Sequence, residues 1–247
     1  MRWLLILLAW LAAPVAADRR GPLVLAASSL TDVMTAAADA WAQAGHARPV
    51  LSFGASSDLA RQVRAGAPGD LFASADEAWV DTLVRERLVR SRTRAVLAGN
   101  RLVVVAPSAW RGTLTRATLA RTLGAGPLAM ADPDAVPAGR YGRAALTSLG
   151  AWPAVAPRVV RAANVRAALL LVERGAAPFG VVYATDARAS AGVRIAGAFP
   201  AASHPPIRYP IVRLAASRDG EAEAFRRFLL SPTGQAIFAR HGFTPAR

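Results

Sequence analysis

The sequence predicts an α/β protein of two α/β lobes, with a ligand cleft between them and a hinge made of two chain segments. Short apolar segments alternate with segments of helical composition, which is typical of parallel sheets covered by helices. The second half of the chain repeats this order without visible sequence repetition. Two extended segments, residues 98–107 and 199–210, are placed to cross between the lobes. Small ligands usually bind in such a cleft.

The elements of the first half follow from local signals. Ser29 is placed to cap the first helix, because Asp32 follows three residues later, close to a capping box. Gly45 ends that helix, and the Gly- and Pro-containing residues 66–69 end the next one. In chain order we expect strand 23–27, helix 29–43, strand 49–53, a helix from residue 57 or 58 to 65, strand 70–74 and helix 77–86.

The second half continues the same alternation. Asn164 is placed to cap one helix, and Ser231 followed by Pro232 is typical of another helix start. We expect lobe one to comprise residues 18–102 and 207–247, and lobe two residues 103–206. In chain order the expected elements are strand 102–106, helix 115–123, strand 128–131, helix 140–149, helix 165–174, strands 179–183, 193–199 and 207–214, helix 221–230 and a last helix from residue 231.

Composition limits the classes of protein that the chain can belong to. Of the 247 residues, 53% are hydrophobic and 19% charged, as in folded globular proteins. Cysteine is absent, which excludes disulfides, thiolate metal sites and cysteine nucleophiles. It also excludes the lipid-anchored cysteine of a bacterial lipoprotein.

The N-terminal residues have the pattern of a signal peptide. Arg2 supplies the positive start, residues 3–13 the apolar run, and Val15-Ala16-Ala17 the small-residue cleavage site. We expect residues 1–17 to be removed by cleavage after Ala17, which leaves a periplasmic protein without a lipid anchor. A retained N-terminal anchor is the alternative. No later stretch reaches the roughly 18 apolar residues of a membrane-spanning helix.

A strand, a small-residue turn and a helix follow one another at residues 49–62, around Gly54-Ala55-Ser56. The first N–H groups of a helix lack intrahelical partners, and the helix dipole favours negative charge at that end. Such a turn is therefore a candidate anion site, and it recurs at Ser28-Ser29. The alternative is that Ser56 or Ser57 only caps its own helix.

Positive charge is high but scattered. The net charge is +14, and all 30 basic residues are arginine. These arginines form no dense run and are not interleaved with aromatic residues, so we expect no nucleic-acid partner. Long-range attraction of a small anion is the interpretation that we favour.

Ten segments form an ordered pattern along the chain: residues 25–30, 52–62, 65–76, 99–107, 132–133, 136–139, 171–174, 178–183, 209–210 and 241–243. In this order and spacing they resemble the periplasmic molybdate-binding proteins of ABC importers. The resemblance covers nearly the whole chain after the signal peptide, and it implies the two-lobed periplasmic binding protein fold.

The resemblance implies a site in which hydroxyl and backbone N–H groups hold the oxyanion, without a metal cation or a cofactor. Its hydroxyl donors fall on Ser29, Ser56 and Tyr183, and its backbone donors on Ala138 and Val165. Ser57 replaces Ser56 if the register slips by one residue. The implied protein is a monomer that is not an enzyme. It captures molybdate or tungstate and delivers the ion to the membrane subunits of an ABC permease.

Two other classes of function compete with this interpretation. One is a binding protein for another tetrahedral oxyanion such as sulfate, because the sequence does not fix the cavity size. The other is a serine hydrolase that uses Ser56, Asp58 and either His204 or His241. The segment around Ser56 is not the Gly-x-Ser-x-Gly nucleophile elbow, which argues against the hydrolase. The sequence contains no His or carboxylate cluster with the spacing of metal ligands, which argues against capture of a metal cation.

Overall fold

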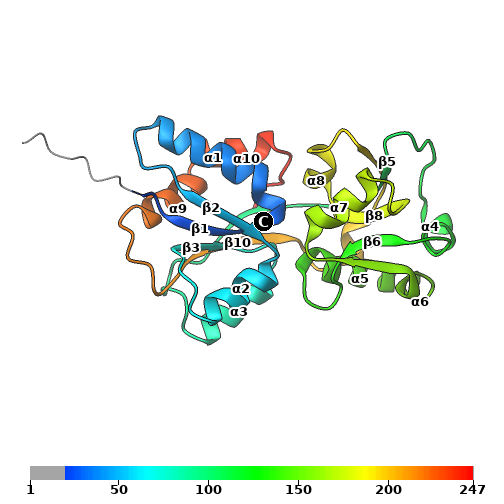
Figure 1. Ribbon diagram of the computed structural model, residues 1–247, viewed down its shortest axis with the longest axis horizontal. Helices are drawn as coiled ribbons and strands as arrows, with labels where there is room; N and C mark the ends of the chain where they lie inside the picture. The colour runs from blue at the N-terminus through cyan, green and yellow to red at the C-terminus, as the bar shows by residue number, and fades with distance from the viewer. Residues whose placement is uncertain (1–19, 247) are drawn as a thin grey trace, which may run out of the picture.

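Two five-stranded sheets, each flanked by helices, make up the protein in a computed structural model that describes residues 20–246 (Figure 1). We call the part built on the first sheet lobe one and the part built on the second sheet lobe two. The predicted two-lobed α/β fold is confirmed. The predicted signal peptide and its cleavage site after Ala17 lie outside the described residues.

Lobe one contains four strands that run in the same direction and one antiparallel strand, β10, in the order β2-β1-β3-β10-β4. Helices α1 and α10 lie above this sheet in Figure 1, and α2 and α3 lie below it. The strands are β1 (Leu23–Ala27), β2 (Val50–Gly54), β3 (Leu71–Ala73), β4 (Ala95–Gly99) and β10 (Arg208–Arg213). The helices are α1 (Thr31–Gln43), α2 (Ser56–Arg64), α3 (Glu77–Arg85), α9 (Ala222–Leu230) and α10 (Pro232–Arg240).

Lobe two has the same topology, with the strand order β7-β6-β8-β5-β9 and the antiparallel strand β5 in the fourth position, as β10 is in lobe one. This shared order confirms that the second half repeats the first. The strands are β5 (Leu102–Pro107), β6 (Leu128–Ala131), β7 (Val159–Ala162), β8 (Phe179–Tyr183) and β9 (Val193–Ala198). The helices are α4 (Arg116–Leu123), α5 (Pro137–Ser148), α6 (Trp152–Val155), α7 (Val165–Glu173) and α8 (Ala184–Arg188).

The chain crosses between the sheets twice, from β4 to β5 and from β9 to β10. After the second crossing, α9 and α10 return to lobe one, where both pack against α1. Two crossings form the expected two-segment hinge. The domain limits at residues 102/103 and 206/207 stay a prediction. The two sheets show which strands belong together, but they do not show at which residue one domain ends and the other begins.

Most expected elements form within two residues of their predicted ends, and the exceptions have local causes. Helix α5 begins at Pro137 and not at residue 140, because proline fits the first helical position, where no N–H bond is needed. Strand β7 was not predicted, since this edge strand exposes Val160 and Arg161 and carries no buried apolar pattern. Strand β4 and the short helices α6 and α8 were also missed.

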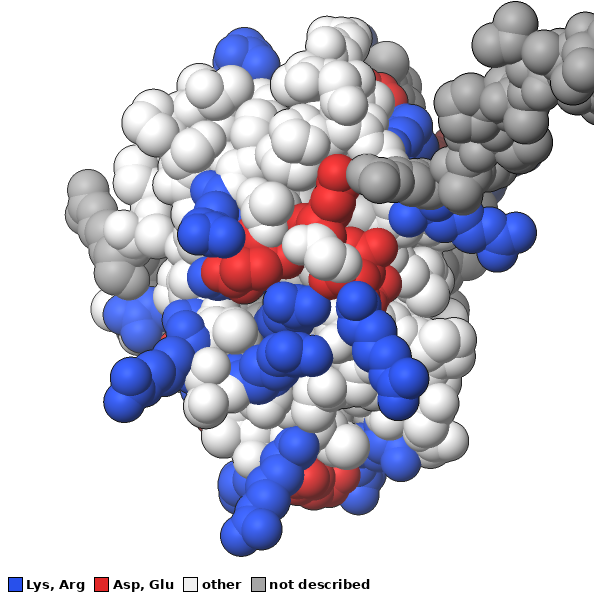
Figure 2. Space-filling view, turned by 90° about the vertical axis from the view of Figure 1, so that its left-hand side faces the viewer, with Lys and Arg blue, Asp and Glu red and all other residues white. Residues whose placement is uncertain are grey.

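Charged side chains are mixed on the end of lobe one that Figure 2 shows. There, arginines surround a central group of acidic side chains and form no continuous basic stripe. Several of the lobe's arginines pair with carboxylates, among them Arg48 with Asp39 and Arg64 with Glu86. Such a face suits attraction of small anions better than binding of a polyanion. Within residues 20–246, no helix has the length and apolar character that a membrane crossing requires.

Candidate anion-binding site

A small cavity lies between the lobes and brings together all five residues that the sequence analysis singled out. Ser29 and Ser56 line it from lobe one, and Ala138, Val165 and Tyr183 line it from lobe two. The cavity is small, with a volume of about 10 Å³, far below the roughly 300–1,000 Å³ of sites for drug-sized ligands. The remaining lining residues are Ala27, Ser28, Gly54, Ala55, Ala75, Val136 and Pro137.

Ser56 is the first residue of α2, but its side chain does not cap that helix. The N-cap is Ala55, and no side chain bonds to the first turn. Instead, the Ala75 N–H donates a 3.0 Å hydrogen bond to Ser56 Oγ. The alternative that this serine only caps its own helix is therefore wrong. Ser56 Oγ donates no hydrogen bond among the described residues, so its hydroxyl hydrogen is available to a ligand in the cavity.

Ser29 also differs from its predicted role as an N-cap. Residues Ser28–Leu30 form a 3-10 turn, and α1 begins after it with Leu30 at the N-cap and no side-chain bond. The Tyr209 hydroxyl donates to Ser29 Oγ at 3.1 Å, and Asn100 Nδ2 donates to the Tyr209 oxygen at 3.2 Å. Ser29 thus accepts a bond from the protein, which leaves its own proton to donate. Neither Asn100 nor Tyr209 was predicted as a supporting residue, although both lie in segments that carry the resemblance.

Ser57, the alternative to Ser56, is completely buried and is not among the residues that line the cavity. Its Oγ has no hydrogen-bond partner among the described residues. The structure therefore places Ser56, and not Ser57, at the cavity.

The hydrolase residues are not brought together. Asp58 pairs with Arg61 on the surface, His204 Nδ1 lies 2.8 Å from Pro205 O, and His241 Nδ1 lies 2.9 Å from Ile237 O. Within residues 20–246, no hydrogen bond joins Ser56 to a histidine or to Asp58.

Two helix N-termini of lobe two meet the cavity. Helix α5 has Val136 at its N-cap and Pro137 at its first position, so the Ala138 N–H lies in the first turn. A Cβ on Gly139 would lie 2.2 Å from Ala131 O, so glycine lets α5 begin against the end of β6. In α7, the Asn164 side chain caps the helix by accepting from Ala167 N at 3.0 Å, which confirms the predicted cap. First-turn N–H groups such as those of Ala138 and Val165 lack intrahelical acceptors.

Tyr183 ends β8 with its side chain only 1% exposed. Its hydroxyl has no hydrogen-bond partner among residues 20–246. Burial raises the pKa of this phenol well above its usual value, with nearby Tyr209 adding to the effect. The hydroxyl therefore keeps its proton and is available as a neutral donor at the cavity wall.

The lining contains neutral donors and no charged side chain. Both serine oxygens already accept bonds, and the two helix N-termini present N–H groups and positive dipole ends. In the part of the chain that the structure describes, no group of three or more His, Asp or Glu side chains could hold a metal ion. The arrangement suits an anion whose oxygens only accept hydrogen bonds.

Comparison with known proteins agrees with this geometry. The family model described as bacterial extracellular solute-binding protein matches residues 22–244. The molybdate-binding protein ModA of Escherichia coli is 43% identical over 232 residues, which cover 92% of this chain and 90% of that protein. ModA of Haemophilus influenzae is 37% identical over 227 residues, 90% of this chain and 89% of that protein.

Among solved structures, the periplasmic molybdate-binding protein of Azotobacter vinelandii matches with a TM-score of 0.82 and 25% identity, covering 92% of this chain and all of that one. The sulfate-binding protein SubI of Mycobacterium tuberculosis shares the fold, with a TM-score of 0.78 at 19% identity over 92% of this chain and 88% of that one. The family model spans both lobes, and the resemblance predicted from the sequence is confirmed. The chain belongs to the bacterial extracellular solute-binding protein family.

Proposed function

We propose that this protein binds molybdate in the cavity between its lobes, and that tungstate binds in the same way. The single observation that carries the proposal is the convergence of Ser29, Ser56, Ala138, Val165 and Tyr183 on one small cavity without a charged lining residue. Relatives named as molybdate-binding proteins at 43% and 37% identity support the same ligand.

The donor set favours an oxyanion that carries no proton. Hydrogen phosphate needs an acceptor for its O–H, but no carboxylate lines the cavity, and Ser29 Oγ and Ser56 Oγ each already accept one bond, from Tyr209 and from the Ala75 N–H. Molybdate offers four oxygens that only accept. Each charge-assisted hydrogen bond contributes about 1.5–3 kcal/mol, so five or more offset the loss of hydration and of lobe mobility.

Sulfate is the second candidate, because it has the same charge and shape with shorter bonds. We expect its oxygens to reach only part of a donor set that spans both lobes. The relatives above favour molybdate, whereas the similarity to a sulfate-binding protein at 19% identity concerns the fold.

The physiological role follows from the ligand and the family. We propose that the mature chain begins after Ala17, works as a periplasmic monomer without a lipid anchor, and delivers the ion to the membrane subunits of an ABC permease. Neither catalysis nor a cofactor is part of this role. The dispersed positions of Ser56, Asp58, His204 and His241 support a binding function over a hydrolytic one.

Native mass spectrometry tests the proposal. The purified protein is exposed to an equimolar mixture of molybdate, tungstate, sulfate and phosphate and then desalted. We expect the mass increment of one molybdate or one tungstate per chain. A sulfate or phosphate adduct as the main species would contradict the assignment.

A further inference from the structure

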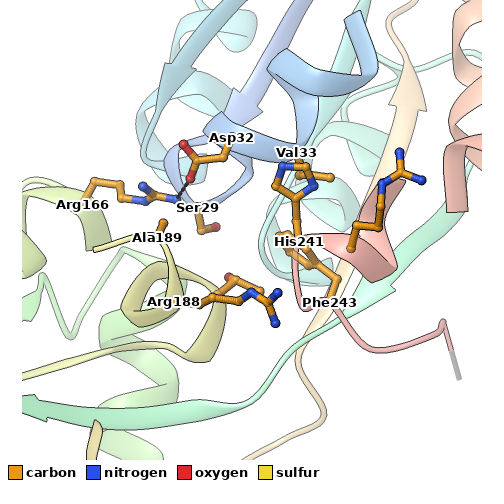
Figure 3. Close-up of a pocket in the computed structure, with 10 residues that line it drawn as sticks. Ser29, Asp32, Val33, Arg166, Arg188, Ala189, His241 and Phe243 are labelled. Atoms are coloured by element: carbon orange, nitrogen blue, oxygen red, sulfur yellow. Dashed lines mark hydrogen bonds and ion pairs between the residues drawn. The ribbon is translucent and has the colours of Figure 1, made fainter. Parts of the chain in front are cut away.

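A second cavity adjoins the anion-binding cavity on the side of α1, α8 and α10, and Ser29 lines both. Figure 3 shows Arg166 extending from lobe two to Asp32 of lobe one across this second cavity. Arg166 Nη2 lies 2.5 Å from Asp32 Oδ2, and Arg166 Nε lies 2.6 Å from Asp186 Oδ1. One guanidinium therefore joins the lobes beside the proposed ligand.

These contacts connect three of the donor segments. Arg166 follows Val165 at the start of α7, and Asp32 lies three residues after Ser29. Asp186, which is fully buried, also accepts the Tyr183 N–H at 3.2 Å through its second oxygen. The position of Arg166 thus fixes where Val165 and Tyr183 lie relative to Ser29.

A second pair has the same layout on the opposite side of the anion-binding cavity. Arg140 of α5 reaches Asp76 of lobe one, with 3.0 Å between Nη1 and Oδ2. Arg140 lies two residues after Ala138. Asp76 follows Ala75, whose N–H donates a hydrogen bond to Ser56 Oγ. Asp76 is itself fixed, because it is 5% exposed and caps α3 by accepting the Trp79 N–H at 3.1 Å.

The geometry points to Arg166 and Arg140 as positioning residues, each paired with a lobe-one aspartate to hold the donors of both lobes around the anion. The inference rests on the proposed function, because it assigns a role at that same site. We call the two pairs, Arg166–Asp32 and Arg140–Asp76, the clasps. Each clasp joins the lobes and must break when the hinge opens. The clasps therefore act on release of the ligand more than on its capture.

Stopped-flow kinetics with molybdate tests the clasps. Asp32→Asn removes one charge from the first clasp and keeps the Arg166–Asp186 pair, and Arg140→Gln removes one charge from the second. Matched controls lie on the same helices. Asp39→Asn removes a pair with Arg48 inside lobe one, and Arg143→Gln removes a pair with Asp134 inside lobe two. These four side chains are 44–49% exposed, so loss of charge and of surface packing is comparable.

We expect the dissociation rate to rise about threefold to tenfold in each clasp variant, with the association rate within about twofold of the parent, since partly exposed pairs contribute modestly. Arg140→Lys should recover part of the loss. The controls should match the parent. Equal dissociation rates in the parent and both clasp variants, or an equal rise in the controls, would overturn the inference.

A measurement without ligand separates this inference from the proposed function. Because the chain has no cysteine, Gln43→Cys in α1 and Ser148→Cys in α5 give two unique spin-label sites, both exposed, one on each lobe. In ligand-free protein, the clasp variants should shift the interlabel distance distribution to longer distances, and the controls should not. Absence of that shift overturns the clasps. Failure of the parent to bind molybdate overturns the proposed function, while the label distances still decide the clasps.

Discussion

The Tyr209 hydroxyl donates a 3.1 Å hydrogen bond to Ser29 Oγ, a residue 180 positions away in the chain. The two meet because β10 returns to the first sheet and lies beside β3, whose other neighbour is β1. Ser29 follows β1 directly in the 3-10 turn. Because Ser29 Oγ accepts this bond, its own hydrogen remains available to donate to an anion.

Tyr209→Phe should therefore weaken molybdate binding although Tyr209 is not among the residues that line the cavity. Loss of the bond lets the Ser29 hydroxyl rotate, and we expect about 1 kcal/mol of lost binding free energy, roughly fivefold in Kd. Calorimetric titration measures the change. Tyr141→Phe is the control, since its hydroxyl bonds Pro206 O and lies off the anion-binding cavity. Equal affinity of Tyr209→Phe and the parent would show that this bond does not orient Ser29.

Tyr183→Phe should separate binding from stability. The hydroxyl has no partner among the described residues, so its removal should leave the Tm of the ligand-free protein equal or higher. Binding of molybdate should weaken by about 1.5–3 kcal/mol, because one charge-assisted bond is lost. Thermal melts with and without molybdate measure both effects. A variant with parental affinity would remove Tyr183 from the site.

Ser56→Ala and Ser57→Ala should behave in opposite ways. Ser56→Ala removes an anion donor and leaves the buried Ala75 N–H without its acceptor, so affinity and stability should both fall, each by about 1–3 kcal/mol. Ser57→Ala removes a buried hydroxyl without a partner among residues 20–246, so stability should hold and binding should change little. Urea unfolding and calorimetry on both variants decide whether Ser56 or Ser57 donates to the anion. A larger loss of affinity in Ser57→Ala would assign the donor to Ser57.

Asp186 should give the unfolding free energy a specific pH dependence. Burial raises the pKa of its carboxyl to about 6, although the Arg166 guanidinium and the Tyr183 N–H lower it. A raised folded-state pKa stabilises the fold below the unfolded-state value of 3.8, and this contribution is lost as pH rises to about 6.

Between pH 4 and pH 7, the unfolding free energy of the parent should therefore fall relative to that of Asp186→Asn. The difference should reach at most about 3 kcal/mol, since one pKa unit corresponds to about 1.4 kcal/mol. Urea denaturation followed by tryptophan fluorescence at several pH values measures it. Parallel pH profiles of the two proteins would contradict the raised pKa.

Local signals in the sequence predicted the elements but not the partners of their side chains. Asn164 caps α7 as expected, because an N-cap and its acceptor bond lie within one turn. Ser29 was assigned a cap by the same reasoning, but its partner Tyr209 arrives from a distant strand. A pattern within one segment carries no information on such a contact.

The roles of Ala138 and Val165 could not be predicted from the chemistry of their side chains. Their side chains offer no hydrogen bond, so only the resemblance to a family pointed to them. The structure adds that both lie in the first turns of helices that begin at one cavity. Arg166 and Arg140 lie beside these donors in the sequence. Their proposed positioning role rests on their aspartate partners in the other lobe, which only the structure shows.

Competition calorimetry tests the central claim most directly. Molybdate is titrated into the protein alone and then in the presence of excess sulfate. A site of neutral donors spanning both lobes predicts one molybdate per chain, with sulfate at least about a hundredfold weaker, a difference of roughly 3 kcal/mol. Sulfate binding within tenfold of molybdate, or no heat of molybdate binding, would contradict the account.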